Sequence, residues 1–355
     1  MAQRSKLIVL SAVFVVLLAT YVVGSIVTSR AGRSPVAGES VVAESLVSDS
    51  RSIRLTGAGE EALETFLTRS DGGRWQIRLE DGLYPADTDR VDGLIDALGA
   101  MEKVRVAATG SDYHQDFDVA GEAARDIVLL GENDQELARV VFGKAVAGGG
   151  RMYARREGDD RVFIIDRDIG SYFGQNAPYW SDLRPLPDEL TQAAVTRISA
   201  DGDLQIDEET RIADRFTLYR DGGNGGGTWR LEGPDGEAEP SLDQAAVDSL
   251  ASAVTELEAQ SFVTRRDVET GLSNPSATVS FEDDSGGSYT VRIGNSAGEE
   301  RFYMRVTGDG VDVNDAGEPF LYAVSSYQVR RILKNRDALI SEADARAGEP
   351  GEESR

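Results

Sequence analysis

The stretch GRWQIRLEDG at residues 73–82 recurs as GTWRLEGPDG at residues 227–236, and this repetition indicates a duplicated fold. Each copy places a tryptophan, Trp75 or Trp229, shortly after a glycine-rich turn. A short strand-like run precedes each copy, and two such runs around a glycine-rich turn are typical of a β-hairpin. The sequence therefore predicts two related units, which can be aligned outward from the two tryptophans.

An amphipathic helix is expected after each tryptophan. In both copies apolar residues fall at i, i+3, i+4, i+7 and i+10, a spacing that gives a helix one apolar face. The first set is Val91, Leu94, Ile95, Leu98 and Met101, and the second set is Val247, Leu250, Ala251, Val254 and Leu257.

Four strand-like segments follow each helix in the same order. Because they come in hairpin-length runs and do not alternate with helices, they favour an α+β fold with a mainly antiparallel sheet. The sequence thus predicts two tandem repeat units, at residues 51–190 and 191–342, each a mainly antiparallel sheet with an amphipathic helix on one face. The matching segments are 126–131 with 277–281, 138–143 with 289–294, 151–155 with 301–305, and 162–166 with 319–324.

One hydrophobic stretch, LIVLSAVFVVLLATYVVGSIV from Leu7 to Val27, contains 21 residues and no charge. At about 1.5 Å per residue, a helix of this length matches a hydrocarbon core of roughly 30 Å. A cleavable signal peptide is the alternative, but its apolar region is usually only about 7–15 residues long and ends in a small-residue cleavage pattern. We therefore predict an N-terminal transmembrane helix, a single-pass anchor within residues 1–33.

The orientation of this anchor depends on the flanking basic residues. Arg4 and Lys6 precede the stretch and Arg30 and Arg33 follow it, so the positive-inside rule is nearly balanced. The N-terminal amine favours an N-in orientation, which places the soluble region outside the cytoplasm, at the cytoplasmic (inner) membrane.

Two further segments keep neither a helical nor a strand period. Residues 34–50 are rich in Ser, Ala, Val and Glu, and we expect them to form a flexible spacer. Residues 343–355 are polar and of low complexity, and we expect a disordered tail there.

Composition excludes several classes of function. The formal net charge of −25 repels nucleic acid at long range, so nucleic-acid binding is excluded. The chain contains no cysteine, which excludes disulfides, thiolate metal sites and cysteine nucleophiles. His114 is the only histidine, so multi-histidine metal sites are excluded as well, and no cofactor is predicted.

The repeated pattern Arg-x-Tyr-x-Arg, with x apolar, is the best candidate for a binding site. Alternate side chains of a β-strand share one face, so both arginines and the tyrosine of each copy point the same way. Such basic, aromatic faces suit a small anion, a glycan or an acidic segment of a partner. Alternatively, the arginines pair with neighbouring carboxylates and the tyrosines pack across strands. The candidates are Arg151, Tyr153 and Arg155 in the first copy and Arg301, Tyr303 and Arg305 in the second.

Catalytic patterns are not recognisable in the sequence. The glycine runs at residues 148–150 and 222–227 precede strands and lack the Lys-Ser or Lys-Thr of a phosphate-binding loop, which favours hairpin turns. No G-x-S-x-G elbow accompanies His114. A glycoside hydrolase needs two carboxylates across a cleft, and the many acidic residues single out no such pair.

Several short motifs connect the chain with a known family. With the N-terminal anchor and the W-x-(I/L) pattern at Trp75, they resemble the domain-of-unknown-function family numbered 4340, over most of the region from about 70 to 340. The resemblance implies an anchored envelope protein, of a kind often encoded beside gliding-motility-type ABC transporter components, and it supplies no catalytic residues. The motifs are Tyr84-Pro85-Ala86-Asp87, Phe142-Gly143-Lys144, Tyr153-x-Arg155, VFIID at residues 162–166, and Tyr179-Trp180.

Three hypotheses about function follow from the sequence. The leading one is a non-enzymatic, membrane-anchored accessory or interaction protein that contacts ABC transporter subunits or a gliding-type complex. The second is an extracytoplasmic module that binds a small anion or a glycan. The third, a carboxylate-based hydrolase, would require a converging pair of acids in a pocket.

Overall fold

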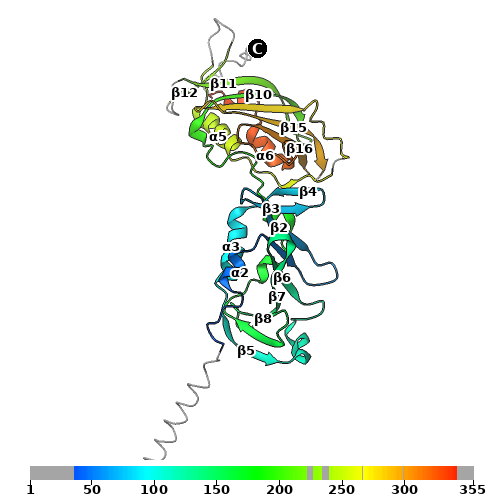
Figure 1. The fold of residues 1–355 in the computed structure, drawn as a ribbon. Coiled ribbons are helices and arrows are strands. Elements are labelled where there is room, and N and C mark those ends of the chain that lie inside the picture. Colours follow the sequence, from blue (N-terminus) through cyan, green and yellow to red (C-terminus); the bar gives the residue numbers. More distant parts are fainter. Residues whose placement is uncertain (1–35, 222–226, 234–239, 266, 299, 342–355) are drawn as a thin grey trace, which may run out of the picture. The chain divides into compact units, whose positions relative to one another are not determined.

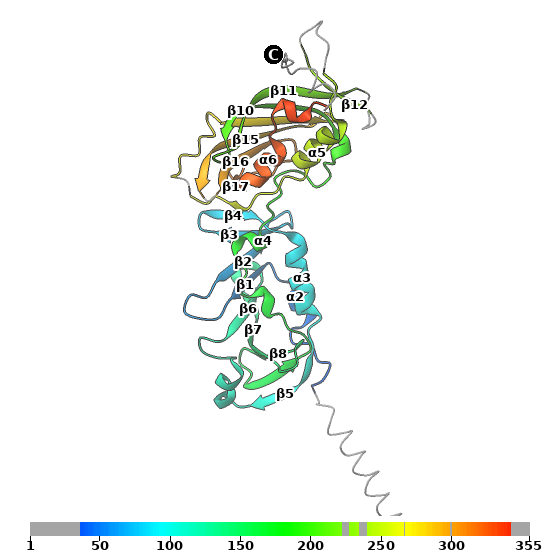
Figure 2. The ribbon, with the colours of Figure 1, turned by 180° about the vertical axis from the view of Figure 1, so that it is seen from behind.

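The computed structural model describes residues 36–221, 227–233, 240–265, 267–298 and 300–341. These residues form two compact units (Figure 1 and Figure 2). The first unit comprises the residues up to Arg69 together with Asp89–Asn176, and the second comprises Ser70–Thr88 together with the residues from Ala177 onward. The strands form two antiparallel sheets and helices are few, which confirms the predicted α+β class.

The sheet of the first unit has the strand order β2-β1-β6-β7-β8-β9-β5. Its helix α3 buries Val91, Leu94 and Leu98, three of the residues in the predicted apolar stripe. The elements are α2 (Glu44–Ser48), β1 (Ser52–Thr56), β2 (Glu64–Arg69), α3 (Thr88–Gly99), β5 (Lys103–Thr109), η1 (Ser111–Tyr113), η2 (Gln115–Phe117), β6 (Arg125–Leu130), η3 (Glu132–Asp134), β7 (Glu136–Ala145), β8 (Met152–Arg156), β9 (Arg161–Ile165) and η4 (Gly170–Tyr172).

The second unit contains the β3–β4 hairpin and an eight-stranded sheet of order β12-β11-β10-β14-β15-β16-β17-β13. Figure 1 and Figure 2 both show α5 and α6 side by side against one face of this sheet. The elements are β3 (Trp75–Leu79), β4 (Gly82–Pro85), α4 (Ala177–Trp180), η5 (Gln192–Ala194), β10 (Val195–Gln205), β11 (Arg211–Asp221), β12 (Thr228–Leu231), α5 (Gln244–Thr255), β13 (Ser261–Phe262), β14 (Ala277–Asp283), β15 (Ser288–Gly298), β16 (Arg301–Gly308), β17 (Leu321–Ser325), α6 (Ser326–Ile332) and η6 (Arg336–Leu339).

The two sheets share one topology. Read from β2 in the first unit and from β11 in the second, each successive strand has a counterpart at the same place: β2 and β11, β1 and β10, β6 and β14, β7 and β15, β8 and β16, β9 and β17, β5 and β13. The second Arg-x-Tyr-x-Arg segment lies on β16, and the first lies on β8 except for Arg151, which directly precedes it. The strands β8 and β16 occupy the same position in this order. A contact made in one unit can therefore be compared directly with the contact at the same place in the other.

The division into units differs from the predicted boundary near residue 190. The β3–β4 hairpin belongs with the second unit. Its Tyr84 ring packs against Phe262 and Phe320, with centroids 4.7 and 5.2 Å away, and Arg74 forms a 2.7 Å ion pair with Asp312. These contacts join residues far apart in the chain, so an alignment of repeats cannot reveal them.

A flexible spacer at residues 34–50 is wrong for the part that the structure describes. Val41 and Val42 are each 1% exposed, and α2 follows them directly. The Lys103 ammonium, itself almost buried, lies 3.2 Å from a carboxylate oxygen of Glu39. The apolar valines thus bury this segment against the first unit instead of leaving it in solvent.

The predicted anchor, Leu7 to Val27, and the predicted tail, residues 343–355, lie outside the described residues. Within the part of the chain that the structure describes, no helix is long and apolar enough to cross a membrane. Attachment to a membrane, its orientation and the tail therefore stay predictions from the sequence.

Candidate binding site

The Arg-x-Tyr-x-Arg strands have the alternating burial that their sequence predicts. On β8, Met152 and Ala154 are buried while Tyr153 is half-buried. On β16, Phe302 and Met304 are buried. Arg301, Tyr303 and Arg305, which alternate with them, are half-buried. Each strand thus sends its apolar residues into the core and its basic and aromatic residues to the opposite face of the sheet.

In the first unit, Arg155 has hydrogen-bond and ion-pair partners within the chain, and Tyr153 has an aromatic packing partner. The Arg155 Nε–H donates to the Val119 carbonyl at 2.9 Å, and its guanidinium lies 3.5 Å from the Glu157 carboxylate. The Tyr153 ring packs on Phe117, with centroids 4.6 Å apart. Tyr153 and Arg155 therefore fit the alternative interpretation, in which the arginine pairs with a carboxylate and the tyrosine packs against neighbouring residues. Arg151 directly precedes β8 and is exposed.

Arg155 also lines a shallow pocket of about 330 Å³, in which most charged side chains already have partners within the chain. Arg139 forms a 2.8 Å ion pair with Asp126 and a 3.0 Å ion pair with Glu136. Arg125 donates to the Gly143 carbonyl at 3.3 Å. The arginines of this pocket therefore already have hydrogen-bond partners within the chain.

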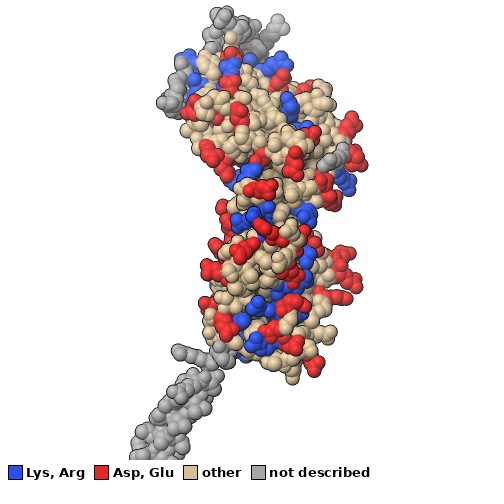
Figure 3. Space-filling model, in the orientation of Figure 1, with Lys and Arg blue, Asp and Glu red and all other residues tan. Residues whose placement is uncertain are grey.

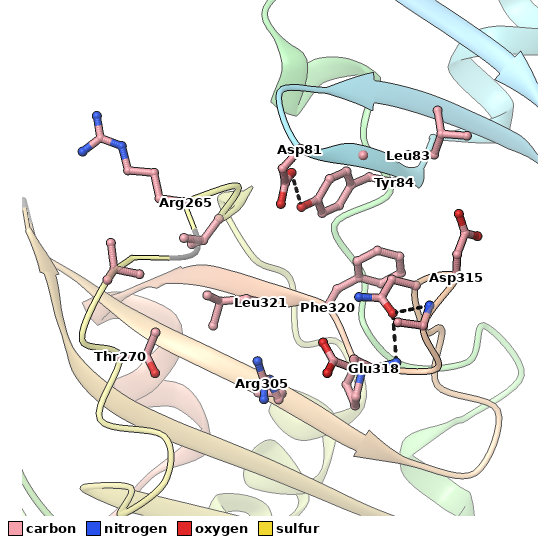
Figure 4. A pocket seen from close by; sticks show the side chains of 16 residues that line it. Asp81, Leu83, Tyr84, Arg265, Thr270, Arg305, Asp315, Glu318, Phe320 and Leu321 are labelled. Atoms are coloured by element: carbon pink, nitrogen blue, oxygen red, sulfur yellow. Dashed lines mark hydrogen bonds between the residues drawn. The ribbon is translucent and has the colours of Figure 1, made fainter.

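The equivalent residue of the second unit, Arg305, lines a larger pocket of about 490 Å³ (Figure 4). Its Nε is buried and has no hydrogen-bond partner among the described residues. No ion pair of Arg305 occurs in the described part of the chain either. We call this cavity the Arg305 pocket. It is bordered by β4, by β16, by residues of the 314–321 segment, and by Val263, Arg265, Val268 and Thr270.

One wall of the Arg305 pocket is aromatic and apolar. Tyr84 and Phe320 line it, and each ring is less than one tenth exposed as part of the cluster around Phe262. The Tyr84 hydroxyl donates to the Asp81 carboxylate at 2.6 Å. Leu321 continues the wall toward Arg305, as Figure 4 shows. An apolar part of a ligand would bury surface here.

The lining of the pocket also carries charges of both signs. Arg305 and the exposed Arg265 contribute guanidinium donors, and Asp315 and Glu318 contribute exposed carboxylates. In Figure 4 Glu318 lies on the same side of the cavity as Arg305. The Asn314 side-chain oxygen accepts hydrogen bonds from the backbone N–H groups of residues 316 and 318.

A second arginine stands directly across from Arg305. The register of β15 and β16 pairs Arg292 with Arg305, and paired residues on adjacent antiparallel strands point to the same face. Like charges in this arrangement repel each other. Arg292 is exposed and, within the described residues, forms no hydrogen bond or ion pair through its side chain. The two arginines thus place two like charges beside each other on this face of the sheet.

Five of the six predicted residues do not line this pocket: Arg151, Tyr153 and Arg155 belong to the first unit, and Arg301 and Tyr303 lie outside its lining. Arg305 alone of the second triplet lines the pocket; Arg301 donates to the Gly298 carbonyl at 3.4 Å. Tyr303 is half-buried on the same strand. Sequence reasoning missed Arg292 and the wall formed by Tyr84 and Phe320. Arg292 could have been found by aligning residues 289–294 with residues 301–305 as antiparallel neighbours.

The described residues lack the side-chain cluster of a metal site, and the surroundings of His114 are defined. They contain no group of three or more His, Cys, Asp or Glu side chains placed to hold a metal ion. His114 is 8% exposed, and its Nε2 is hydrogen-bonded with the Asp160 carbonyl at 3.1 Å. Figure 3 shows acidic and basic side chains interspersed on the visible face of each unit, so the net charge is spread over that face.

One carboxylate outside the pocket has an altered acidity. Burial raises the pKa of Asp182, the N–H and the charge of Arg184 oppose this, and the carboxylates of Asp188 and Asp87 add to it. A raised pKa is a feature of some catalytic acids. Here it follows from the burial of Asp182 beside the end of β4, where its backbone N–H donates to the Pro85 carbonyl at 3.0 Å.

The stability of the second unit should therefore depend on pH through Asp182. Its folded pKa lies above the unfolded value of about 3.9, so the folded state holds the proton more tightly. Ionisation as pH rises from the unfolded pKa through the folded pKa then lowers the free energy of unfolding. We expect Asp182→Asn to remove this loss and to be at least as stable as the unsubstituted protein at neutral pH.

Urea unfolding at a series of pH values, followed by tryptophan fluorescence, measures this effect. Asp283 provides a comparison of opposite sign. Burial disfavours its ionised form, but hydrogen bonds from Ser285, Gly287 and Tyr289 outweigh burial and lower the pKa of Asp283. Asp283→Asn should lose stability at neutral pH. If Asp182→Asn also lost stability at neutral pH, the assigned cause of the Asp182 shift would be wrong.

The fold and the pocket define an α+β protein with two antiparallel sheets of one topology and a partly basic pocket in the second. The chain belongs to the family described as Domain of unknown function (DUF4340), whose sequence model matches residues 75–275 and 229–343. The resemblance seen in the short motifs is thereby confirmed.

A more distant relative is an uncharacterized protein of Treponema pallidum (strain Nichols). It is 19% identical over 139 residues, which are 39% of this chain and 44% of that protein. The chain thus spans less than half the length of this relative. No solved structure matches the chain.

Proposed function

We propose that this protein is a non-enzymatic binding protein whose Arg305 pocket holds a ligand with an anionic group on an apolar body. The observation that carries the proposal is the buried Arg305 Nε, which has no hydrogen-bond partner among the described residues. A buried donor without a partner costs about 1–3 kcal/mol. An anionic ligand would accept from the part of the Arg305 guanidinium that lines the pocket, and its apolar part would cover Tyr84 and Phe320.

Anion binding is favoured over hydrolysis by the positions of the carboxylates. Asp81 is engaged with the Tyr84 hydroxyl, and Asp315 and Glu318 are exposed on the loop before β17. A general acid for hydrolysis is normally held in an environment that favours its protonated form. Exposed carboxylates lack that environment, which supports a binding role.

We further propose, from the sequence, that this binding occurs at a membrane. The uncharged stretch from Leu7 to Val27 supports an anchor, and what the short motifs of the sequence imply by resemblance supports a partner among ABC transporter subunits or a gliding-type complex. Purification in mild detergent tests the partner. Recovery of the protein without any transporter subunit under several detergent conditions would contradict this part of the proposal.

Calorimetric titration of the full-length protein with benzoate tests the pocket itself, because benzoate joins one carboxylate to an apolar ring. Arg305→Met should weaken benzoate binding about 10- to 100-fold, since a hydrogen bond to a charged group contributes about 1.5–3 kcal/mol. Arg151→Met is the matched control: it removes one exposed arginine of the same strand pattern outside the pocket, and binding should not change. Benzamide, which has no charge, should bind at least as weakly as benzoate does to Arg305→Met.

Two results would contradict the proposal. Benzoate that bound equally well to Arg305→Met would have its site elsewhere. Absence of benzoate binding to the unsubstituted protein, together with absence of acetate and phosphate binding, would show that Arg305 does not serve an anion.

A further inference from the structure

We propose that the natural ligand of the Arg305 pocket is an acidic peptide segment of a partner protein, an inference that rests on the proposed function. The segment would supply a carboxylate and a main-chain carbonyl to Arg305. In the first unit the chain supplies those same two groups to Arg155, from Glu157 and Val119. The first unit is thus a filled version of the site, and the second unit is an open one.

The two units share a close crossing of a loop over a strand of the sheet. In each unit a loop passes so close over the sheet that the strand below needs a glycine. A Cβ on Gly143 of β7 would overlap with the Phe117 carbonyl oxygen, and a Cβ on Gly294 of β15 would overlap with the Thr270 carbonyl oxygen. The strands β7 and β15 hold the same place in their sheets. The loops at Phe117 and Thr270 are therefore equivalent.

Beyond this crossing the two units differ at the contacts of the arginine. In the first unit the carbonyl two residues after Phe117, that of Val119, accepts from Arg155. In the second unit no such bond to Arg305 is formed within the described residues, and Thr270 borders the open pocket instead. The carbonyl that fills the first site is missing from the second.

Two side chains near the arginine also differ between the units, and both differences make the surroundings of Arg305 less negative than those of Arg155. Glu157 follows Arg155 by two residues, whereas Thr307 follows Arg305 by two residues. Across the neighbouring strand, the residue paired with Arg155 is Val141, whereas the residue paired with Arg305 is Arg292. The second unit therefore lacks the carboxylate and gains a positive charge. Both differences increase the affinity of the site for a carboxylate from outside.

The remaining groups of the pocket favour a peptide over a small inorganic anion. A peptide backbone offers carbonyl acceptors for the guanidinium groups and N–H donors for Asp315 and Glu318. The same carboxylates would repel a phosphate dianion more strongly than a single carboxylate. Apolar side chains beside the acidic residue would cover the wall of Tyr84 and Phe320. Donors, acceptors and apolar surface thus match a short acidic segment with aromatic or aliphatic neighbours.

A short peptide blocked at both ends, with one glutamate between two phenylalanines, is a suitable probe for the full-length protein. Its binding is measured by fluorescence anisotropy and compared with the peptide that carries glutamine instead. The glutamate peptide should bind at least about 10-fold more tightly, and Arg305→Met should lose about 10- to 100-fold in affinity. Arg292→Met should lose a smaller factor, about 2- to 5-fold, because its charge is exposed.

Arg155→Met is the matched control in the first unit, where the arginine is already satisfied. It should leave peptide affinity unchanged. Arg305→Lys keeps the charge but removes the guanidinium donors, and it should restore only a small part of the affinity. Hydrogen exchange of β16 in each variant confirms that the second unit is folded.

The outcomes separate this inference from the proposed function. Equal binding of the glutamate and glutamine peptides, alongside benzoate binding that depends on Arg305, would overturn the peptide assignment and leave an anion site. Loss of peptide affinity in Arg155→Met equal to that in Arg305→Met would overturn the distinction between an open and a filled site. Failure of both peptide and benzoate to bind would reject both proposals.

Discussion

Alanine at Gly143 or at Gly294 is expected to destabilise the unit that carries it by at least about 3 kcal/mol. At each position the added Cβ would overlap with a backbone carbonyl oxygen, of Phe117 or of Thr270. For Gly294 the next nearest atoms, at 3.1 and 3.2 Å, are also backbone atoms, so no flexible side chain can move aside. The loop must shift as a whole. Because Thr270 borders the Arg305 pocket, Gly294→Ala should also weaken ligand binding.

Gly99→Ala is the control for these two variants. No atom lies within 4 Å of a Cβ built at Gly99, at the end of α3, so alanine should be neutral or stabilising by up to about 1 kcal/mol. Denaturant unfolding of all three variants measures the differences. Stabilities for Gly143→Ala and Gly294→Ala within about 0.5 kcal/mol of the unsubstituted protein would show that the loops do not cross the strands as described.

Asp248→Leu is expected to destabilise the second unit by about 3 kcal/mol. One Asp248 oxygen accepts from the Arg220 guanidinium at 2.9 Å and from the Trp229 indole N–H at 3.0 Å. The Arg220 side chain is only 5% exposed, and its guanidinium stacks 4.6 Å from the Trp229 ring centre. Removing the carboxylate takes an ion-pair partner away from a nearly buried positive charge. The effect stays at the lower end of the usual range because the Asp248 side chain is 46% exposed.

Asp248→Asn separates the charge from the hydrogen bond. The amide oxygen can still accept from Trp229, so this variant should lose about half as much stability as Asp248→Leu. Asp243→Ala, which removes the cap at the start of α5, should cost about 1 kcal/mol and serves as a reference in the same helix. A loss for Asp248→Leu no larger than that for Asp243→Ala would mean that Arg220 does not depend on this carboxylate.

The repeated strands and helices could be predicted because local patterns determine them. The apolar stripes of α3 and α5 are set by helical periodicity, and most of their predicted residues are buried. The alternation on β8 and β16 follows from strand geometry. Nothing outside these segments was needed to recognise them.

The assignment of the β3–β4 hairpin could not be predicted in the same way. Its place in the second unit depends on Tyr84 packing against Phe262 and Phe320, which lie 178 and 236 positions away along the chain. The prediction of a flexible spacer at residues 34–50 was wrong for a related reason. Val41 and Val42 show no period in so short a segment, and only their burial against the first unit orders them.

The candidate site shows both the strength and the limit of sequence reasoning. The pattern Arg-x-Tyr-x-Arg identified Arg155 and Arg305 as equivalent, but it could not distinguish them. Their difference lies in their surroundings: Arg155 has the Val119 carbonyl and the Glu157 carboxylate, and Arg305 has Arg292 across the strand. The register of neighbouring strands and the path of a loop decide this, and both are tertiary features.

The most direct test of the central claim compares Arg305→Met with Arg155→Met in the absence of ligand. Native-state hydrogen exchange of β16 and β8 reports the local free energy of opening in each unit. Arg155→Met should lower the value for β8 by about 1.5 kcal/mol, because a charge-assisted hydrogen bond is lost. Arg305→Met should leave the value for β16 unchanged or raise it, because a buried donor without a partner is removed. A loss in β16 equal to that in β8 would contradict the account, since Arg305 would then be a structural residue and not an open binding group.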